Sequence, residues 1–168
     1  MEPKLFWIPG PWRGKLAVAS RPRGGDWLED EIKGWRKAGL DVVVCLLEED
    51  EAAQFELSRE GDVAESKGVH FISFPIPDRG VPASTREALS LFSTIAAALE
   101  EGENVAVHCR QGIGRSGLVA AAALLTSGIG VEKALEVVST ARGEAVPETP
   151  AQLHWIRHLP SERLVLTS

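Results

Sequence analysis

The sequence predicts an α/β fold in which helices flank a central, mostly parallel sheet and the C-terminal half is helical. Two observations support this prediction. Short apolar runs alternate with segments of helical periodicity over the first two thirds of the chain, and three helical segments then follow one another. With 168 residues, of which 44% are hydrophobic, the chain suits one globular domain over residues 1–168.

The first strand and the first helix have clear sequence signals. Residues 16–20 (LAVAS) form a short apolar run that predicts a strand. A helix is expected to begin at Asp26, a candidate N-cap, and to end at Gly39, a typical helix stop. Its apolar positions recur at helical spacing, namely Trp27, Leu28, Ile32 and Trp35.

Two further strands bracket a polar helical segment. Residues 40–47 (LDVVVCLL) are β-branched and uniformly apolar in their centre, which is typical of a fully buried strand. Residues 69–76 (VHFISFPI) predict another strand. Between them, residues 51–67 are expected to be helical, with an interruption at Gly61.

A long helix and a last strand lead into the helical half. After the loop PDRGVPAS, either Ser84 or Thr85 is expected to cap a helix. Its predicted apolar face comprises Leu89, Leu91, Phe92, Ile95, Ala96 and Leu99. The strand NVAVHC at 104–109 comes next, and three helices are expected at 117–127, 131–141 and 149–158.

The overall composition argues against several kinds of partner. The net charge is −6, whereas nucleic acid and anionic membrane surfaces are bound by clustered Lys and Arg. There is no run of 18 apolar residues, and the N-terminal stretch is too rich in proline and glycine for a signal peptide. Two cysteines provide no disulfide framework, which agrees with the expected cytoplasmic location. We also expect a monomer.

The stretch HCRQGIGRSG carries the strongest chemical signal. Five residues separate Cys109 from Arg115, and two of them are glycines that tolerate positive φ. Successive backbone N–H groups can therefore turn inward and form a nest for a tetrahedral anion. The residues predicted to bind a phosphate or similar oxyanion are Arg110, Gln111, Gly112, Ile113, Gly114 and Arg115.

The same stretch predicts a nucleophile. A buried strand ends at Cys109 and a helix is expected to begin near Ser116, so the thiol faces the positive end of a helix. This field, the inward amides and Arg115 should lower the thiol pKa from about 8.5 into the range of roughly 3.5–7.5. The alternative is a buried cysteine in a tight turn, but the combined spacing of cysteine, glycines and arginine favours a thiolate.

This pattern resembles the phosphate-binding loop of the cysteine-dependent protein tyrosine phosphatases, and specifically their compact, dual-specificity branch. The similar sulfurtransferase loop has one residue fewer between Cys and Arg. The resemblance implies a phosphatase-like fold and metal-independent hydrolysis of phosphotyrosine on a protein or peptide through a phosphocysteine, with phosphoserine and phosphothreonine left open. It implies no cofactor.

Hydrolysis of a phosphate monoester also requires an acid to protonate the leaving oxygen. Asp78, in the loop PIPDRGVP, is the candidate, and the alternative is a simple turn former. The pair Pro77-Asp78 matches the acid-bearing loop of the family, although Ile76 replaces the tryptophan of the classical enzymes. Other carboxylates, Glu48, Glu49, Asp50 and Asp62, are interpreted as solvated, while the family's acidic segment that supports the arginine could lie among 48–51.

Four further residues have assigned roles and open alternatives. Gln152 resembles the glutamine that positions water in the family, or is an exposed first-turn residue. Ser116 is expected to hydrogen-bond the thiolate, to cap a helix, or both. His108 is expected to orient its surroundings rather than to bind a metal. Cys45 is interpreted as a small core residue, with a protective disulfide to Cys109 as the sharper hypothesis.

Other functions remain as alternatives at this stage. No metal site is expected, since only His154 and His158 are spaced on one helical face. A module that binds phosphoprotein without turnover would be expected to lack one of the three catalytic candidates. Phosphoinositide phosphatases that resemble this loop carry lysines inside it, and here there are none. Sulfur or arsenate transfer and RNA triphosphate chemistry are disfavoured by the loop length and the acidic charge.

Overall fold

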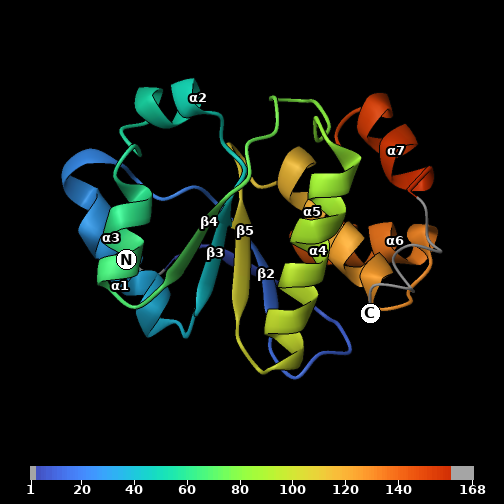
Figure 1. Ribbon diagram of the computed structural model, residues 1–168, viewed down its shortest axis with the longest axis horizontal. Helices are drawn as coiled ribbons and strands as arrows, with labels where there is room; N and C mark the ends of the chain where they lie inside the picture. Colours follow the sequence, from blue (N-terminus) through green and yellow to red (C-terminus); the bar gives the residue numbers. More distant parts are fainter. Residues whose placement is uncertain (1–2, 160–168) are drawn as a thin grey trace.

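A five-stranded sheet forms the centre of the molecule, with helices on both of its faces (Figure 1). The computed structural model describes residues 3–159. The strand order is β1-β2-β5-β3-β4; only the β1–β2 pair is antiparallel, so the predicted fold class is confirmed. The strands are β1 (Leu5–Ile8), β2 (Leu16–Ala19), β3 (Val42–Cys45), β4 (His70–Ser73) and β5 (Val105–His108).

The helices divide into two groups on opposite sides of the sheet (Figure 1). One face is covered by α1 (Leu28–Lys37), α2 (Glu49–Gln54) and α3 (Glu60–Ser66). The other face carries α4 (Thr85–Glu100), α5 (Gly114–Thr126), α6 (Val131–Arg142) and α7 (Pro150–Arg157). The predicted helical C-terminal half is therefore the layer that packs on this second face.

Alternation along the central strands produces two separate cores. In β3, Val42 and Val44 pack with α4 to α7, whereas Val43 and Cys45 pack with α1 and α3. All four side chains are buried because β3 lies inside the sheet with helices on both faces. This two-sided burial explains why the strand reads as a continuous apolar run.

The N-terminal strand β1 was not predicted. It lies at the edge of the sheet and pairs antiparallel with β2, from Leu5 opposite Ala19 to Ile8 opposite Leu16. Its four residues are followed at once by proline and glycine, which mask any periodicity. The strand exists because β2 offers an edge for pairing, and a sequence window does not contain that information.

The helical segment predicted for 51–67 has its break in a different place. The chain leaves α2 after Gln54 and begins α3 at Glu60, and Glu56 between them has a φ of +56°. Gly61 lies inside α3, so its predicted role as the interruption is wrong. A Cβ at Gly61 would come within 2.8 Å of the Phe71 ring, so close packing of α3 on β4 requires the glycine.

Two details of the other helices also differ from the prediction. Asp26 does not cap α1, because a short 3-10 turn precedes that helix and Trp27 occupies the N-cap. Ser84 caps α4 as expected, accepting a hydrogen bond of 3.1 Å from the Glu87 amide. The buried residues of α4 are Ala88, Leu91, Phe92, Ile95 and Leu99. Leu89 packs against the same core while partly buried, whereas Ala96, also predicted, is not among the core residues.

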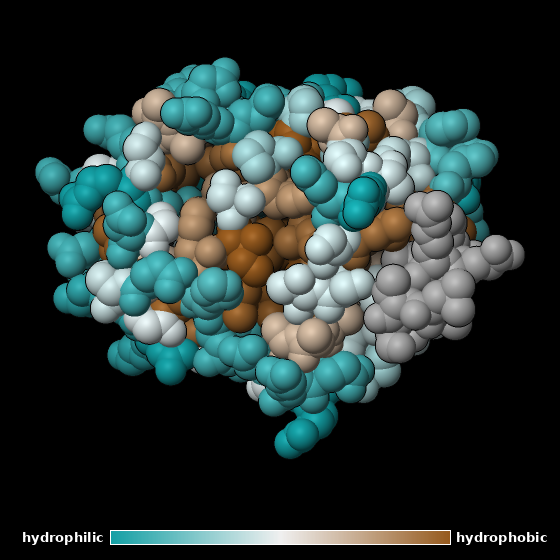
Figure 2. All heavy atoms as spheres, in the orientation of Figure 1, coloured by the Kyte–Doolittle hydropathy of each residue, from teal (hydrophilic) through white to brown (hydrophobic). Residues whose placement is uncertain are grey.

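Figure 2 shows apolar surface on the face of the molecule viewed in Figure 1. A shallow groove of about 350 Å³ lies between β4 and α4 and includes Ile72, Ile95 and Ala98 in its wall. Within residues 3–159, no helix is long and apolar enough to cross a membrane.

Candidate active site

The candidate site lies where the parallel strands end, the usual position for ligands in open α/β sheets. The chain leaves β5 at His108, turns through residues 109–113 and enters α5 at Gly114. Residues 109–115 are hereafter called the phosphate loop. A cavity of about 210 Å³ opens above this loop. It is lined by Asp78, Arg79, Cys109, Arg110, Gln111, Ile113, Gly114, Arg115 and Glu148.

The two glycines of the phosphate loop serve different purposes. Gly112 has the expected positive φ, +72°, and a Cβ there would lie 2.9 Å from the Ala19 carbonyl oxygen. Gly114 does not adopt positive φ; it is the first residue of α5. A Cβ on Gly114 would come within 3.0 Å of Glu148 and 3.2 Å of Gln152 Oε1. Gly114 therefore allows α7 and its preceding loop to approach closely.

The environment of Cys109 stabilises its thiolate. Burial alone would raise the pKa of this thiol. Hydrogen bonding from the hydroxyl and amide of Ser116, the charge of Arg115 and the Gly112 amide outweigh burial, so the Cys109 pKa is lowered. The buried Ser116 hydroxyl makes no hydrogen bond within residues 3–159, so it is available to donate to the anionic sulfur. The helix begins earlier than predicted, so Ser116 lies within its first turn and does not cap it.

Arg115 is buried and held by a set of fixed acceptors. Glu51 binds it with both carboxylate oxygens, at 2.7 Å from Nη1 and 2.9 Å from Nη2. Nη1 also donates to the Ile76 carbonyl oxygen at 2.7 Å. Burial alone would lower the Arg115 pKa, but these contacts and the neighbouring Cys109 raise it. The guanidinium is therefore permanently charged and fixed at the wall of the cavity.

Asp78 is in the cavity wall, on the loop where the sequence placed it. Its carboxylate lies 3.3 Å from Arg115 Nη2 and 3.8 Å from Arg110 Nη1, and its side chain is 45% exposed. The turn that presents it is closed by a hydrogen bond of 2.8 Å from the Gly80 amide to the Pro77 carbonyl. Asp78 thus combines solvent access with contact to the phosphate loop.

The loop that carries Asp78, hereafter the acid loop (residues 77–80), is joined to α7 by hydrogen bonds of Gln152. The Gln152 Nε2 donates to the Gly80 carbonyl at 3.0 Å, and its Oε1 accepts from the amides of Glu148 and Thr149. Gln152 is fully buried, so the alternative of an exposed first-turn residue is wrong. Its amide forms a capping box with Thr149, and its Oε1 lies 3.2 Å from where a Cβ on Gly114 would be. In this arrangement Gln152 connects the acid loop and the phosphate loop.

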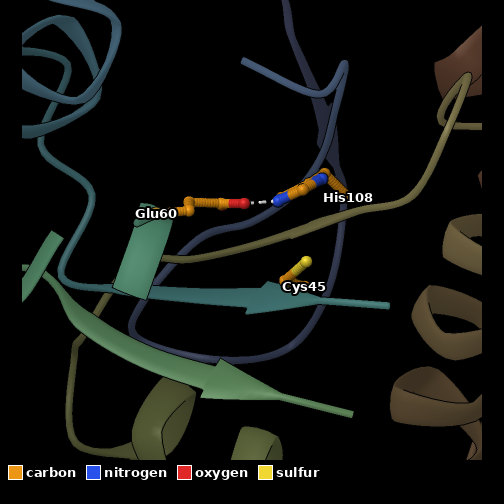
Figure 3. Close-up of side chains that lie close together, drawn as sticks. All are labelled: Cys45, Glu60 and His108. Atoms are coloured by element: carbon orange, nitrogen blue, oxygen red, sulfur yellow. Dashed lines mark hydrogen bonds and ion pairs between the residues drawn. The ribbon is translucent and has the colours of Figure 1, made fainter. Parts of the chain in front are cut away.

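His108 points away from the cavity, toward α3 (Figure 3). Its Nε2 lies 2.6 Å from Glu60 Oε2, and both side chains are buried. Burial alone would lower the His108 pKa, but the Glu60 charge, together with contacts to Cys45 and Glu60, raises it well above the usual value. This direction favours a protonated imidazole paired with Glu60. The orienting role of His108 stays a prediction.

Cys45, Glu60 and His108 could in principle hold a metal ion, since their ligand atoms lie within 4.8 Å of one another. However, zinc bonds of about 2.0–2.1 Å would place tetrahedral N and O ligands about 3.3 Å apart. The 2.6 Å between Nε2 and Oε2 is the distance of a hydrogen bond. In the part of the chain that is described, we interpret this cluster as an ion pair in contact with a thiol.

The structure argues against the proposed disulfide between Cys45 and Cys109. Cys45 pairs with His108 across β3 and β5 and faces the α1 and α3 core. Cys109 belongs to the core on the opposite face. Because the two side chains point to opposite faces of the sheet, a direct disulfide would require the backbone to move.

Two residues of the site were not singled out from the sequence. Glu51 fell within the acidic range that the resemblance suggested, and its capping box with Glu48 at the start of α2 was a further local signal. Arg142, at the end of α6, donates to the carbonyl oxygens of Gly112 and Gln111. No feature of the sequence near Arg142 indicated this contact.

The phosphate loop brings a cysteine and an arginine to one cavity, and a carboxylate lies in the wall of the same cavity. This arrangement is typical of proteins that bind phosphate beside a reactive cysteine. Comparison with known proteins identifies the family. A family model described as the DSP-PTPase phosphatase of polymorphic toxin systems matches residues 17–129. A protein of Invertebrate iridescent virus 6, described as a tyrosine phosphatase, is 33% identical over 158 residues, or 92% of this chain and 56% of the viral protein.

Solved structures agree with this assignment. Tk-PTP in its active form is 33% identical, with a TM-score of 0.77 and coverage of 97% of this chain and 99% of that one. Kinase associated phosphatase, with its catalytic cysteine replaced by serine, has a TM-score of 0.86 at 19% identity, covering 98% and 97% of the two chains, which supports the fold. The chain belongs to the DSP-PTPase phosphatase family, and it spans 56–61% of the length of its first curated relatives.

Proposed function

We propose that this protein hydrolyses phosphotyrosine on a protein or peptide, without a metal ion, through a phosphocysteine intermediate. The observation that carries the proposal is that Cys109, Arg115 and Asp78 line one cavity of about 210 Å³. They are the three groups that phosphoryl transfer to a thiolate requires: a nucleophile, a cation for the equatorial oxygens and an acid. A module that only bound phosphate would not need the acid or the lowered thiol pKa.

In the first step the Cys109 thiolate attacks phosphorus in line with the leaving oxygen. The Arg115 guanidinium and the inward amides of the phosphate loop stabilise the negative charge on the equatorial oxygens. Asp78 donates its proton to the departing phenolate oxygen, so the products are free tyrosine on the substrate and a phosphocysteine.

In the second step a water molecule attacks the phosphocysteine, and Asp78 accepts the proton that the water loses. The Ser116 hydroxyl donates to the sulfur as the thiolate departs, and inorganic phosphate is released. In this proposal Gln152 contributes by holding the acid loop through Gly80. Direct contact of its amide with water would require it to leave the capping box.

The rim of the cavity favours a peptide substrate that carries negative charge. Three arginines, Arg79, Arg110 and Arg115, line it, against the two carboxylates of Asp78 and Glu148. Phosphotyrosine is the proposed preference, because its ring can carry the phosphate to a buried arginine, whereas phosphoserine has a shorter reach. A phosphoinositide is the second candidate, and the cationic rim alone does not distinguish it.

The test compares phosphate release by the wild type with that by Cys109→Ser, Asp78→Asn and the control Cys45→Ser, all in chelator. Phosphotyrosine peptides, phosphoserine peptides and a soluble phosphoinositide serve as substrates. We expect Cys109→Ser to be inactive and Asp78→Asn to lose about 100-fold or more in kcat. Cys45→Ser should retain turnover. Unchanged turnover in Cys109→Ser would end the thiolate mechanism, and activity that vanishes only in chelator would indicate a metal.

A further inference from the structure

Arg142 connects the end of α6 to the phosphate loop. Its Nε donates to the Gly112 carbonyl oxygen at 2.7 Å, and its Nη2 donates to the Gln111 carbonyl oxygen at 3.2 Å. The guanidinium also lies over the ring of Phe6 in β1, with its carbon 4.2 Å from the ring centroid. An edge strand, a C-terminal helix and the phosphate loop therefore meet at one side chain.

These contacts fix the direction of two backbone amides. In a trans peptide the C=O and N–H bonds point in opposite directions. When Arg142 holds the carbonyls of Gln111 and Gly112, the amides of Gly112 and Ile113 must point the other way. The Gly112 amide is one of the groups that lower the Cys109 pKa, so this amide is directed at the sulfur. The carbonyls bound by Arg142 therefore belong to peptides whose amides serve the site.

The loop needs such support at this point. Gly112 has a φ of +72° and no side chain, so its backbone has more accessible conformations than that of any other residue type. Rotation of the peptide between Gln111 and Gly112 would turn a carbonyl oxygen toward the anion, replacing a donor with a repulsive acceptor. That rotation would break the hydrogen bond from Arg142 to the Gln111 carbonyl, and rotation of the next peptide would break the bond to the Gly112 carbonyl, so the charged donor opposes both rotations.

We propose that Arg142 is a positioning residue for the phosphate loop: it holds the Gly112 and Ile113 amides in the orientation that binds the phosphoryl oxygens and the thiolate. The proposal rests on the proposed phosphatase function. Arg142 does not line the cavity, so its role in the reaction is exerted through the phosphate loop. The competing explanation is that Arg142 merely joins α6 to β1 through Phe6.

The test uses Arg142→Ala and Arg142→Lys in a Cys45→Ser background, so that Cys109 is the one remaining cysteine. Three quantities are measured: kcat and KM on a phosphotyrosine peptide, inhibition by inorganic phosphate and by vanadate, and the pH dependence of Cys109 alkylation by iodoacetamide. Thermal unfolding is followed in parallel. Arg157→Ala is the matched control, because Arg157 makes an exposed ion pair of 2.7 Å with Glu132 on α6.

Arg142→Ala is expected to lower kcat by about 10- to 100-fold, somewhat less than the loss of a direct oxyanion donor. Phosphate and vanadate should inhibit about tenfold less well, and the alkylation midpoint should move to higher pH. Arg142→Lys should recover part of the loss, since an ammonium group can bind one carbonyl but lacks the planar fork that spans two. Arg157→Ala should match the wild type in all three measurements.

A fall in Tm with unchanged kcat, phosphate inhibition and alkylation would overturn the proposal and leave Arg142 as a packing residue. Phe6→Leu provides a further check, because it removes the stacking but keeps the two hydrogen bonds. Should the wild type fail to hydrolyse phosphotyrosine, the proposed function would fail. Phosphate binding and thiol alkylation would still decide whether Arg142 orients the loop.

Discussion

Replacing Glu51 by glutamine removes the charge that faces Arg115 without changing the size of the side chain. The wild-type carboxylate accepts two hydrogen bonds, of 2.7 and 2.9 Å, from the guanidinium. Glutamine offers one oxygen, and its amide group then faces the arginine donor to donor. The Ile76 carbonyl and Asp78 still contact the guanidinium, so Arg115 does not lose every partner.

The loss of stability in Glu51→Gln can be estimated from these contacts. A hydrogen bond to a charged group is worth about 1.5–3 kcal/mol, and removing one partner of a buried ion pair costs about 3–5 kcal/mol. Because Arg115 keeps other acceptors, we expect Glu51→Gln to lower the free energy of unfolding by about 2–3 kcal/mol at neutral pH. For a chain of this size each kcal/mol shifts Tm by about 2–4 °C, so Tm should fall by about 5–10 °C.

Lowering the pH should reduce the difference in Tm between the wild type and Glu51→Gln. The hydrogen bonds from Arg115 lower the pKa of Glu51 in the folded state, against the opposing effect of burial. A lowered folded-state pKa means that Glu51 contributes stability above its unfolded value of about 4.3, and that this stability is lost as pH falls through the folded value. The variant lacks this titration, so its Tm should approach that of the wild type below about pH 4.

Thermal unfolding by circular dichroism at several pH values between 7 and 3.5 measures both effects. Glu49→Gln is the matched control, because Glu49 is exposed and lies in the first turn of the same helix. It should change Tm little. The reasoning would be refuted if Glu51→Gln cost no more than Glu49→Gln, or if the Tm difference stayed constant as the pH falls.

Three further predictions concern the thiol and the loop. Ser116→Ala removes the hydroxyl that donates to the sulfur, so the Cys109 pKa should rise; iodoacetamide alkylation against pH measures it, and an unchanged midpoint would contradict the assignment. Gly112→Ala places a Cβ at positive φ, 2.9 Å from the Ala19 carbonyl oxygen. The free energy of unfolding, measured with denaturant, should fall by at least about 1–2 kcal/mol. An unchanged free energy of unfolding would mean that the loop relaxes freely. Peroxide should oxidise Cys109 without forming a disulfide to Cys45, and mass spectrometry showing that link would contradict the opposite-face arrangement.

Much of the fold was predictable because its signals are local. The continuous valine run of β3, the periodic apolar positions of α1 and the Ser84 cap of α4 all lie within short windows. The edge strand β1 and the break between α2 and α3 were not predicted correctly. Pairing with β2 creates the first. Gly61, where the break was predicted, is a glycine because α3 packs closely on Phe71, so both errors depend on residues outside the local window.

The sequence by itself determined which residues form the centre of the candidate site, because Cys109, the glycines and Arg115 lie within seven consecutive residues whose spacing constrains the loop. Tertiary structure alone decided what supports that loop. Glu51 reaches Arg115 across 64 positions, and Arg142 reaches Gly112 across 30. The Arg115 guanidinium donates to, and the Gly112 carbonyl accepts from, whichever partner the packing brings near, and packing is a property of the whole chain.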